Sequence, residues 1–212
     1  MAPLNRAYEI WIGGQASGKT YNLRRRAIYL SRLRSIQGVF ICDRLSEYQP
    51  RDMPGARVYR AFADYLMDDE LPRIAIFQLD ANAVGYIPVF REAINQGDIA
   101  LVLDEAYSFA PSGGGRFSGC EELQSIVYSG RHLLNVENEL RPTHLLIGVQ
   151  YPKTIYHGIW QQSRTILASK LAGKANKNWV VDNFGDDDWD ANQRLQQYHF
   201  RALRGNLPKT NI

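Results

Sequence analysis

The chain has 212 residues, which is enough for one domain with a full hydrophobic core and short for two. Hydrophobic residues make up 45% and charged residues 22% of it, as is usual for a soluble globular domain. The net charge of only +3 excludes a strong overall attraction to polyanions, so any nucleic-acid surface must be a local patch.

Apolar runs alternate with helical spacing along the chain. In order, the first half predicts a strand at residues 8–12, a helix from Lys19, a strand at 38–43, a loop at 50–55, a short helix at 61–67, a strand at 73–77, a helix around 89–95 and a strand at 99–103. The second half predicts a loop at 111–119, a helix at 121–133, strands at 143–149 and 165–168, a helix at 186–197 and a weak edge strand at 198–202. Continuous apolar strands between helices indicate an α/β fold whose mostly parallel sheet is covered on both faces. We expect a single domain over residues 1–205 and a tail at 206–212.

A glycine-rich octet, GGQASGKT, occupies residues 13–20 and fits the phosphate-binding pattern G-x-x-x-x-G-K-[ST], the Walker A motif. In such a loop the backbone N–H groups surround a phosphate, Lys19 reaches its outer oxygens, and the Thr20 hydroxyl can ligate Mg²⁺. The strand before the octet and the helix after it aim a helix N-terminus at the anion. The predicted nucleotide-binding residues are Gly13, Gly14, Gln15, Ala16, Ser17, Gly18, Lys19 and Thr20. The alternative is a glycine-rich turn with an unrelated lysine.

Two acids, Asp104 and Glu105, end the clearest apolar strand, as in a Walker B motif. The carboxyl end of a parallel strand lies at the sheet edge where ligands of open α/β folds collect. An aspartate there holds Mg²⁺, directly or through water, and the adjacent glutamate can polarise an attacking water. We predict Asp104 as metal partner and Glu105 as catalytic base. A solvated strand end that carries acids for solubility is the alternative.

Two further residues are candidates for phosphoryl-transfer chemistry. Gln150 follows the strand at 143–149, where it could contact both the attacking water and the γ-phosphate; otherwise it is an ordinary strand end. Arg131 lies near the end of the helix predicted at 121–133, which follows the loop at 111–119, and an arginine that reaches the transferring phosphoryl group speeds hydrolysis by roughly 10³–10⁵-fold. In a ring, Arg131 could reach the site of the neighbouring subunit. A cation near a helix C-terminus is the alternative.

Together these motifs resemble the FtsK–HerA superfamily of DNA-pumping ATPases, and most closely the genome-packaging ATPases of tailless icosahedral viruses with an internal membrane. The stretches that carry the resemblance are residues 12–20, 40–43 with Glu47 and Tyr48, 101–105, 130–131 and 145–152. They span roughly residues 8–171. The resemblance implies a RecA/FtsK-like P-loop NTPase fold, ATP and Mg²⁺ as cofactors, and a homohexameric ring with double-stranded DNA in its pore. It also implies the roles given above for Lys19, Thr20, Asp104, Glu105, Gln150 and, in trans, Arg131.

The DNA-contacting surface is less sharply indicated. The loop at 111–119, with Arg116 and Phe117, suits a mobile pore loop that grips phosphates without reading sequence, or else it is a plain surface loop. The arginines at 24–26 spread around a helix, so they predict a solvated or subunit-contacting helix rather than one DNA-binding face. Lys170, Lys174 and Lys177 form a third, weak basic patch.

We therefore expect an ATP-driven DNA translocase that packages viral DNA, with capsid vertex proteins as further partners. A filamentous-phage export ATPase resembling zonular occludens toxin, a small nucleotide kinase and a nucleotide-dependent switch remain alternatives. No apolar run reaches the roughly 20 residues of a membrane helix, and the N-terminus has no secretory pattern. The two cysteines, Cys42 and Cys120, lack metal spacing and indicate a reducing compartment. Together with the resemblance to viral packaging ATPases, which implies a host cell and a virion, these features predict a protein of the host cytoplasm or associated with the virion.

Overall fold

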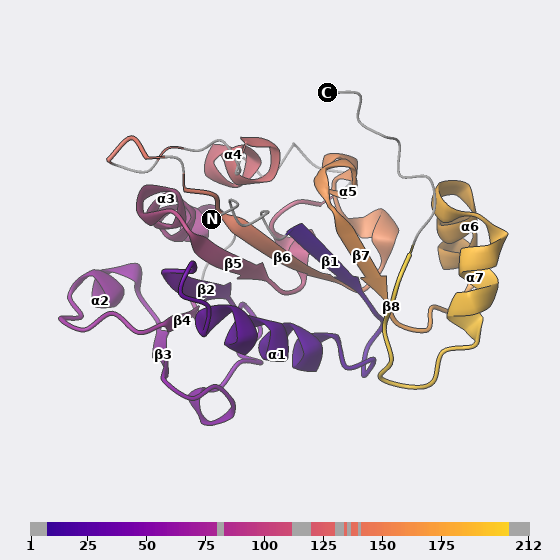
Figure 1. Ribbon diagram of the computed structural model, residues 1–212, viewed down its shortest axis with the longest axis horizontal. Coiled ribbons are helices and arrows are strands. Elements are labelled where there is room, and N and C mark those ends of the chain that lie inside the picture. The colour runs from indigo at the N-terminus through magenta and orange to yellow at the C-terminus, as the bar shows by residue number, and fades with distance from the viewer. Residues whose placement is uncertain are drawn as a thin grey trace.

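The structure, a computed structural model, describes residues 8–79, 83–111, 120–129, 134, 137–139 and 141–203. Its centre is one eight-stranded sheet in the order β3-β4-β2-β5-β6-β1-β7-β8 (Figure 1). The strands are β1 (Tyr8–Ile12), β2 (Gly38–Cys42), β3 (Ala56–Tyr59), β4 (Ile74–Phe77), β5 (Ile99–Leu103), β6 (His144–Val149), β7 (Thr165–Ala168) and β8 (Arg201–Ala202). All neighbouring pairs are parallel except β7 and β8. The predicted α/β class with a mostly parallel sheet is confirmed.

Helices cover both faces of this sheet. They are α1 (Lys19–Ser31), α2 (Phe62–Leu66), α3 (Ile87–Gln96), α4 (Glu121–Ser129), α5 (His157–Gln162), α6 (Lys174–Phe184) and α7 (Asp186–Gln193). Helix α1 packs on one face, and α3, α4 and α5 pack on the other, while α6 and α7 lie beside the β7–β8 edge (Figure 1). The core is accordingly divided into two hydrophobic clusters, one on each side of the sheet.

The central strands form because their residues are apolar on both faces. Every residue of β5 and of β6 is buried, which is the pattern of a parallel strand between two helical layers. The register places Leu103 of β5 opposite Ile147 of β6, and Val149 of β6 opposite Ile12 of β1. The carboxyl ends of β1, β5 and β6 therefore meet at one edge, which brings the segments after these strands together.

Three elements were not predicted from the sequence. Strand β3 lies at the sheet edge with only Tyr59 buried, and its exposed Arg57 pairs with Asp68, so it lacks the apolar run of a central strand. Helix α5 is too short for a helical period to stand out, and α6 is polar apart from a few side chains that pack inward, among them Trp179 and Phe184. Tertiary packing rather than local pattern decides these elements.

Helix ends differ modestly from those predicted. Helix α7 ends at Gln193 rather than at residue 197, because the following turn leads into the short strand β8. Helix α4 is described to Ser129, and the rest of the predicted helix lies outside the described residues. Most of the predicted loop at 111–119 and the predicted tail at 206–212 also lie outside them. Among the described helices, none is both long and apolar enough to span a bilayer.

Candidate active site

The glycine-rich octet forms a tight loop between β1 and α1. The amide of Gly13 donates to the carbonyl of Val149 at 3.0 Å, which continues the β1–β6 ladder into the loop. Gly18 has φ +85°, a conformation that favours glycine, directly before the first helical residue, Lys19. A Cβ atom at Gly13 would lie 2.2 Å from Ser17 Oγ and 2.9 Å from Ser169 Oγ, so a side chain there would require both hydroxyls to move. The strand, loop and helix order predicted for phosphate binding is thus the one observed.

Lys19 reaches from the start of α1 to both acids at the end of β5. Its Nζ lies 2.5 Å from Asp104 Oδ1 and 2.9 Å from Glu105 Oε1, and all three side chains are buried. Burial alone would lower the pKa of Lys19, but the charges and hydrogen bonds of Asp104 and Glu105 outweigh it and raise that pKa above its ordinary value. Lys19 is therefore a fixed positive charge at the junction of the two motifs.

Oxygen ligands converge next to this ion pair. The Thr20 hydroxyl lies 2.7 Å from Asp104 Oδ2, to which it donates, and 3.1 Å from Glu47 Oε2. Mg²⁺ prefers oxygen ligands and is commonly held by one or two carboxylates together with phosphates and water. Groups of three or more histidine, cysteine or acidic side chains that could hold a metal ion do not occur among the described residues. The hydroxyl and carboxylates therefore fit Mg²⁺ that is bound together with a nucleotide.

Tyr48 and Glu47 are functional candidates to which the sequence assigned no role. The Asp43 carboxylate accepts the backbone N–H groups of Glu47 at 3.0 Å and Tyr48 at 2.9 Å, which fixes the turn after β2. The fully buried Tyr48 then donates its hydroxyl to Asp104 Oδ2 at 3.1 Å. Burial and the Asp104 charge raise the pKa of Tyr48 well above its ordinary value, so it stays a donor at neutral pH. The only sequence signal was their presence in the stretches that carry the family resemblance.

Glu105 and Gln150 meet at the adjoining strand ends. Gln150 Nε2 donates to Glu105 Oε1 at 3.1 Å, although 45 residues separate them. The Glu105 backbone has φ +54°, a left-handed conformation that costs a non-glycine residue on the order of 1 kcal/mol or more and often occurs at functional sites. Its second oxygen, Oε2, is buried with no hydrogen-bond partner among the described residues. That oxygen is available as a proton acceptor.

These side chains surround one small cavity. It measures about 220 Å³ and is lined by residues 14–21 together with Glu47, Glu105 and Gln150. The structure thus brings together the predicted loop, metal-binding, base and sensor residues. Arg131, predicted to act from a neighbouring subunit, lies outside the described residues.

Two of the arginines of α1, Arg24 and Arg26, form ion pairs within the chain. Arg24 lies 2.9 Å from Asp52 and also donates to the Glu47 carbonyl at 3.2 Å. Arg26 forms an ion pair with Glu9 of β1. Arg24 and Arg26 are therefore held by acids and a carbonyl of the same chain.

Gly148 of β6 leaves room for the Asp104 carboxylate. A Cβ atom there would lie 2.2 Å from Asp104 Oδ1 and 2.8 Å from Leu23 Cδ1, distances that require one of the two to move. We expect Gly148→Ala to lower the free energy of unfolding by about 1–3 kcal/mol, as overpacked core sites do, measured by urea denaturation. Gly38→Ala in β2 is the matched control, because its nearest neighbour would be Ile99 Cδ1 at 3.4 Å. Equal losses in both variants would contradict the assigned packing.

Comparison with solved structures finds this fold in viral packaging proteins. The genome packaging NTPase B204 from Sulfolobus turreted icosahedral virus 2, in complex with ATP-gammaS, matches with a TM-score of 0.74 at 16% identity, covering 94% of this chain and 92% of that chain. B204, the DNA-packaging ATPase from Sulfolobus turreted icosahedral virus, matches with a TM-score of 0.70 at 15% identity, covering 93% and 96%. No family model and no curated protein matches this chain.

At these identities the likeness establishes the fold. The chain has the P-loop NTPase fold, in the form seen in genome-packaging NTPases, so the resemblance inferred from the motifs is confirmed at the level of fold. The N-terminal domain of zonular occludens toxin from Neisseria meningitidis has a TM-score of 0.44 over 80% of this chain and 79% of its own, which is too low to carry an argument.

Proposed function

We propose that the chain is an ATP-hydrolysing DNA translocase that pumps double-stranded viral DNA into a preformed capsid. One observation carries the proposal. Lys19 and Thr20 at the start of α1 contact the acids at the end of β5, in a fold shared with genome-packaging NTPases. In a P-loop NTPase these two segments bind the triphosphate and its metal ion.

The phosphate side of the site consists of the loop and Lys19. The backbone N–H groups of residues 14–19 and the N-terminus of α1 hold the phosphate oxygens. Lys19 exchanges carboxylate contacts for contacts with the outer phosphates. Thr20 and Asp104 would hold Mg²⁺, and Tyr48 fixes the Asp104 carboxylate. When bound, Mg²⁺ neutralises charge on the phosphate oxygens.

The water side consists of Glu105 and Gln150. Glu105 accepts a proton from, and orients, a water in line with the γ-phosphate, and its Oε2 has no competing partner among the described residues. Gln150, bonded to the other Glu105 oxygen, senses the γ-phosphate and transmits its loss. Arg131 of an adjacent subunit neutralises the charge that grows on the transferring group.

The partners follow from the same proposal. The chain acts as a homo-oligomeric ring, a hexamer, with DNA in the central pore and the loop at 111–119 gripping phosphates. Capsid vertex proteins dock the ring, which works in the host cytoplasm or on the virion. Residues 1–205 form the motor domain.

The experiment that tests this function measures phosphate release from ATP with and without duplex DNA, while native mass spectrometry sizes the particle. We expect stimulation by DNA and a ring. Phosphate transferred to an added nucleoside, or nucleotide binding without turnover, would contradict the proposal.

Arg131→Ala rings should be inactive and regain partial activity when mixed with Lys19→Ala subunits, because each variant supplies the half-site that the other lacks. If mixing never restores activity, the proposal that Arg131 acts in the active site of the neighbouring subunit is wrong.

A further inference from the structure

The outer side of helix α1, together with the residue that caps its C-terminus, carries alternating aromatic and basic side chains. The inner side of the helix is buried in the hydrophobic cluster on that face of the sheet. The residues of the outer side are four, four and three positions apart, which places them along one helical face. These exposed residues, the α1 stripe, are Tyr21, Arg25, Tyr29 and Arg32.

The arginines of the α1 stripe differ from the two that form ion pairs within the chain. Neither Arg25 nor Arg32 has an ion-pair partner among the described residues, unlike Arg24 and Arg26. The guanidinium of Arg25 instead lies 5.8 Å from the centre of the Tyr21 ring. Helix α1 contains no acidic residue, so the stripe presents positive charge that the helix itself does not balance.

A second exposed surface lies on α2 and on the connection from α2 to β4. Its apolar residues are Leu66, Met67 and Leu71, each more than half exposed. Contiguous apolar side chains on the surface of a soluble domain often mark an interaction site. Two exposed acids, Asp64 and Asp69, accompany them, and we call these five residues the α2 patch.

The acids of the α2 patch likewise differ from their neighbours. Arg57 lies 2.5 Å from Asp68 and 3.9 Å from Glu70, so these two acids are engaged within the chain. Asp64 and Asp69 have no ion-pair partner in the part of the chain that the structure describes. The α2 patch therefore presents negative charge beside apolar surface, whereas the α1 stripe presents positive charge beside aromatic rings.

The two surfaces face away from each other in one chain. Tyr65 anchors α2 in the hydrophobic cluster on one side of the sheet, whereas the inner side of α1 belongs to the cluster on the other side. Helix α2 lies near the β3–β4 edge and α1 lies along one face of the sheet (Figure 1). Each surface can therefore meet its complement only on another molecule.

We propose that the α1 stripe of one chain binds the α2 patch of a second copy of this chain. The inference rests on the proposed function, because it names contacts of the proposed ring. The arginines pair with the carboxylates, and the tyrosine rings cover the leucines and the methionine. Aromatic residues, methionine and arginine are enriched in protein interfaces, and complementary charges fix the orientation of the partners. Because the two surfaces differ, the contact is head-to-tail, the kind that generates a ring when it closes.

A charge-swap experiment tests this contact, with native mass spectrometry and light scattering on the full chain in the presence of ATP. Arg25→Glu with Arg32→Glu reverses the charge of the stripe, and Asp64→Lys with Asp69→Lys reverses that of the patch. Each of these variants alone should need at least about a hundredfold higher concentration to assemble, because like charges then face each other. An equimolar mixture of the two should assemble as wild type does, since every subunit then meets opposite charge on both sides.

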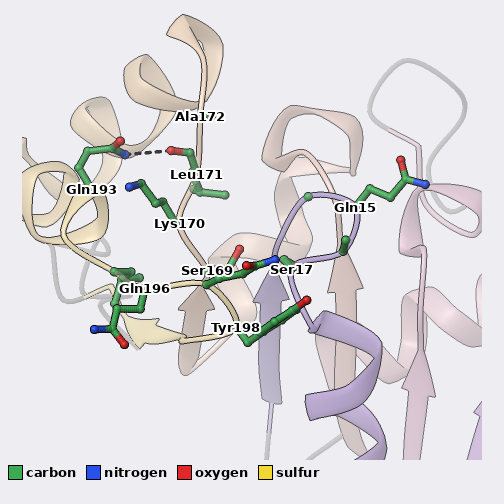
Figure 2. Close-up of a pocket in the computed structure, with 13 residues that line it drawn as sticks. Gln15, Ser17, Ser169, Lys170, Leu171, Ala172, Gln193, Gln196 and Tyr198 are labelled. Carbon is green, nitrogen blue, oxygen red and sulfur yellow. Dashed lines mark hydrogen bonds between the residues drawn. The ribbon is translucent and has the colours of Figure 1, made fainter.

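Lys174→Glu with Lys177→Glu is the matched control, because it makes the same change of charge as the stripe variant at exposed positions. Both lysines lie on α6, which follows residues 169–172 in a wall of the cavity beside the glycine-rich loop (Figure 2). Helix α6 lies beside the β7–β8 edge, and the β3 edge near α2 is at the other end of the sheet. Assembly should be unchanged in this control.

A further variant guards against misfolding of the charge variants. Met67→Ser alters a side chain that is 78% exposed, so the core does not depend on it. It should weaken assembly by about tenfold, because the interface loses one large apolar group.

Two results would overturn the contact and leave the ring of the proposed function in place. One is assembly of all the variants as in wild type. The other is normal assembly of the stripe variant with loss of duplex-DNA binding, which would assign the stripe to nucleic acid. A mixture that stays monomeric while wild type assembles would also overturn the pairing of stripe with patch. Wild type that stays monomeric with ATP and duplex DNA would instead reject the ring itself, and this contact with it.

Discussion

Lys19→Ala is expected to reduce ATP hydrolysis by about 10³-fold, with or without DNA, because it removes the only side-chain cation of the phosphate-binding motif. A charge placed where negative charge grows in the transition state typically contributes 10²–10³-fold or more. Phosphate release measured with and without duplex DNA checks this. Full turnover in the variant would reject the phosphate-binding role on which the proposed mechanism depends.

The same substitution should also destabilise the fold, for a separate reason. Asp104 and Glu105 are buried and both contact Lys19, so the variant leaves two carboxylates without their cation. Breaking a buried ion pair from one side typically costs about 3–5 kcal/mol. Because the pKa of Lys19 is raised in the folded chain, the contribution is complete at neutral pH and is lost only as the pH rises through that raised pKa.

Urea denaturation measures the loss of stability, and circular dichroism confirms that the variant is folded in the activity assay. Lys177→Ala, on the exposed face of α6, is the control and should change neither stability nor hydrolysis appreciably. Unchanged stability of Lys19→Ala would mean that the two acids do not depend on Lys19 for their charge balance.

Glu105→Gln should bind ATP and hydrolyse it slowly, with kcat reduced by about 10²–10⁴-fold. The amide keeps the shape of the side chain and can still bond Lys19 or Gln150, so the loop and the metal-binding groups should persist. It cannot accept a proton from water, however. Turnover and ATP affinity are measured on the same preparation, because loss of both would indicate a damaged site rather than a missing base.

Glu70→Gln is the matched control, since that side chain is 88% exposed and does not line the cavity. Normal hydrolysis in Glu105→Gln would show that the base is misassigned. Glu47, which also lines the cavity and contacts Thr20, would then become the candidate base.

Local sequence was sufficient to predict the strand, loop and helix around the glycine-rich octet, and the end of β5 at which the two acids lie. The positions of Gly13 and Gly18 reflect steric limits that act within a few residues, and the apolar run of β5 reflects burial on both faces. Such short-range constraints leave a pattern in the chain itself. For the same reason the parallel sheet was predictable, whereas β3 was not, because an edge strand is only partly buried and carries charge.

Tertiary structure alone decided which distant groups meet. Tyr48 bonds Asp104 across 56 residues, and Gln150 bonds Glu105 across 45, because the strand order sets which carboxyl ends are neighbours. Likewise, Tyr198 lies against Gly18 because the chain passes the loop on its way from α7 to β8, which pairs antiparallel with β7 at the edge of the sheet. The sequence around one residue of such a pair does not indicate which residue it contacts. These contacts depend on strand order and register, which follow from packing of the whole chain.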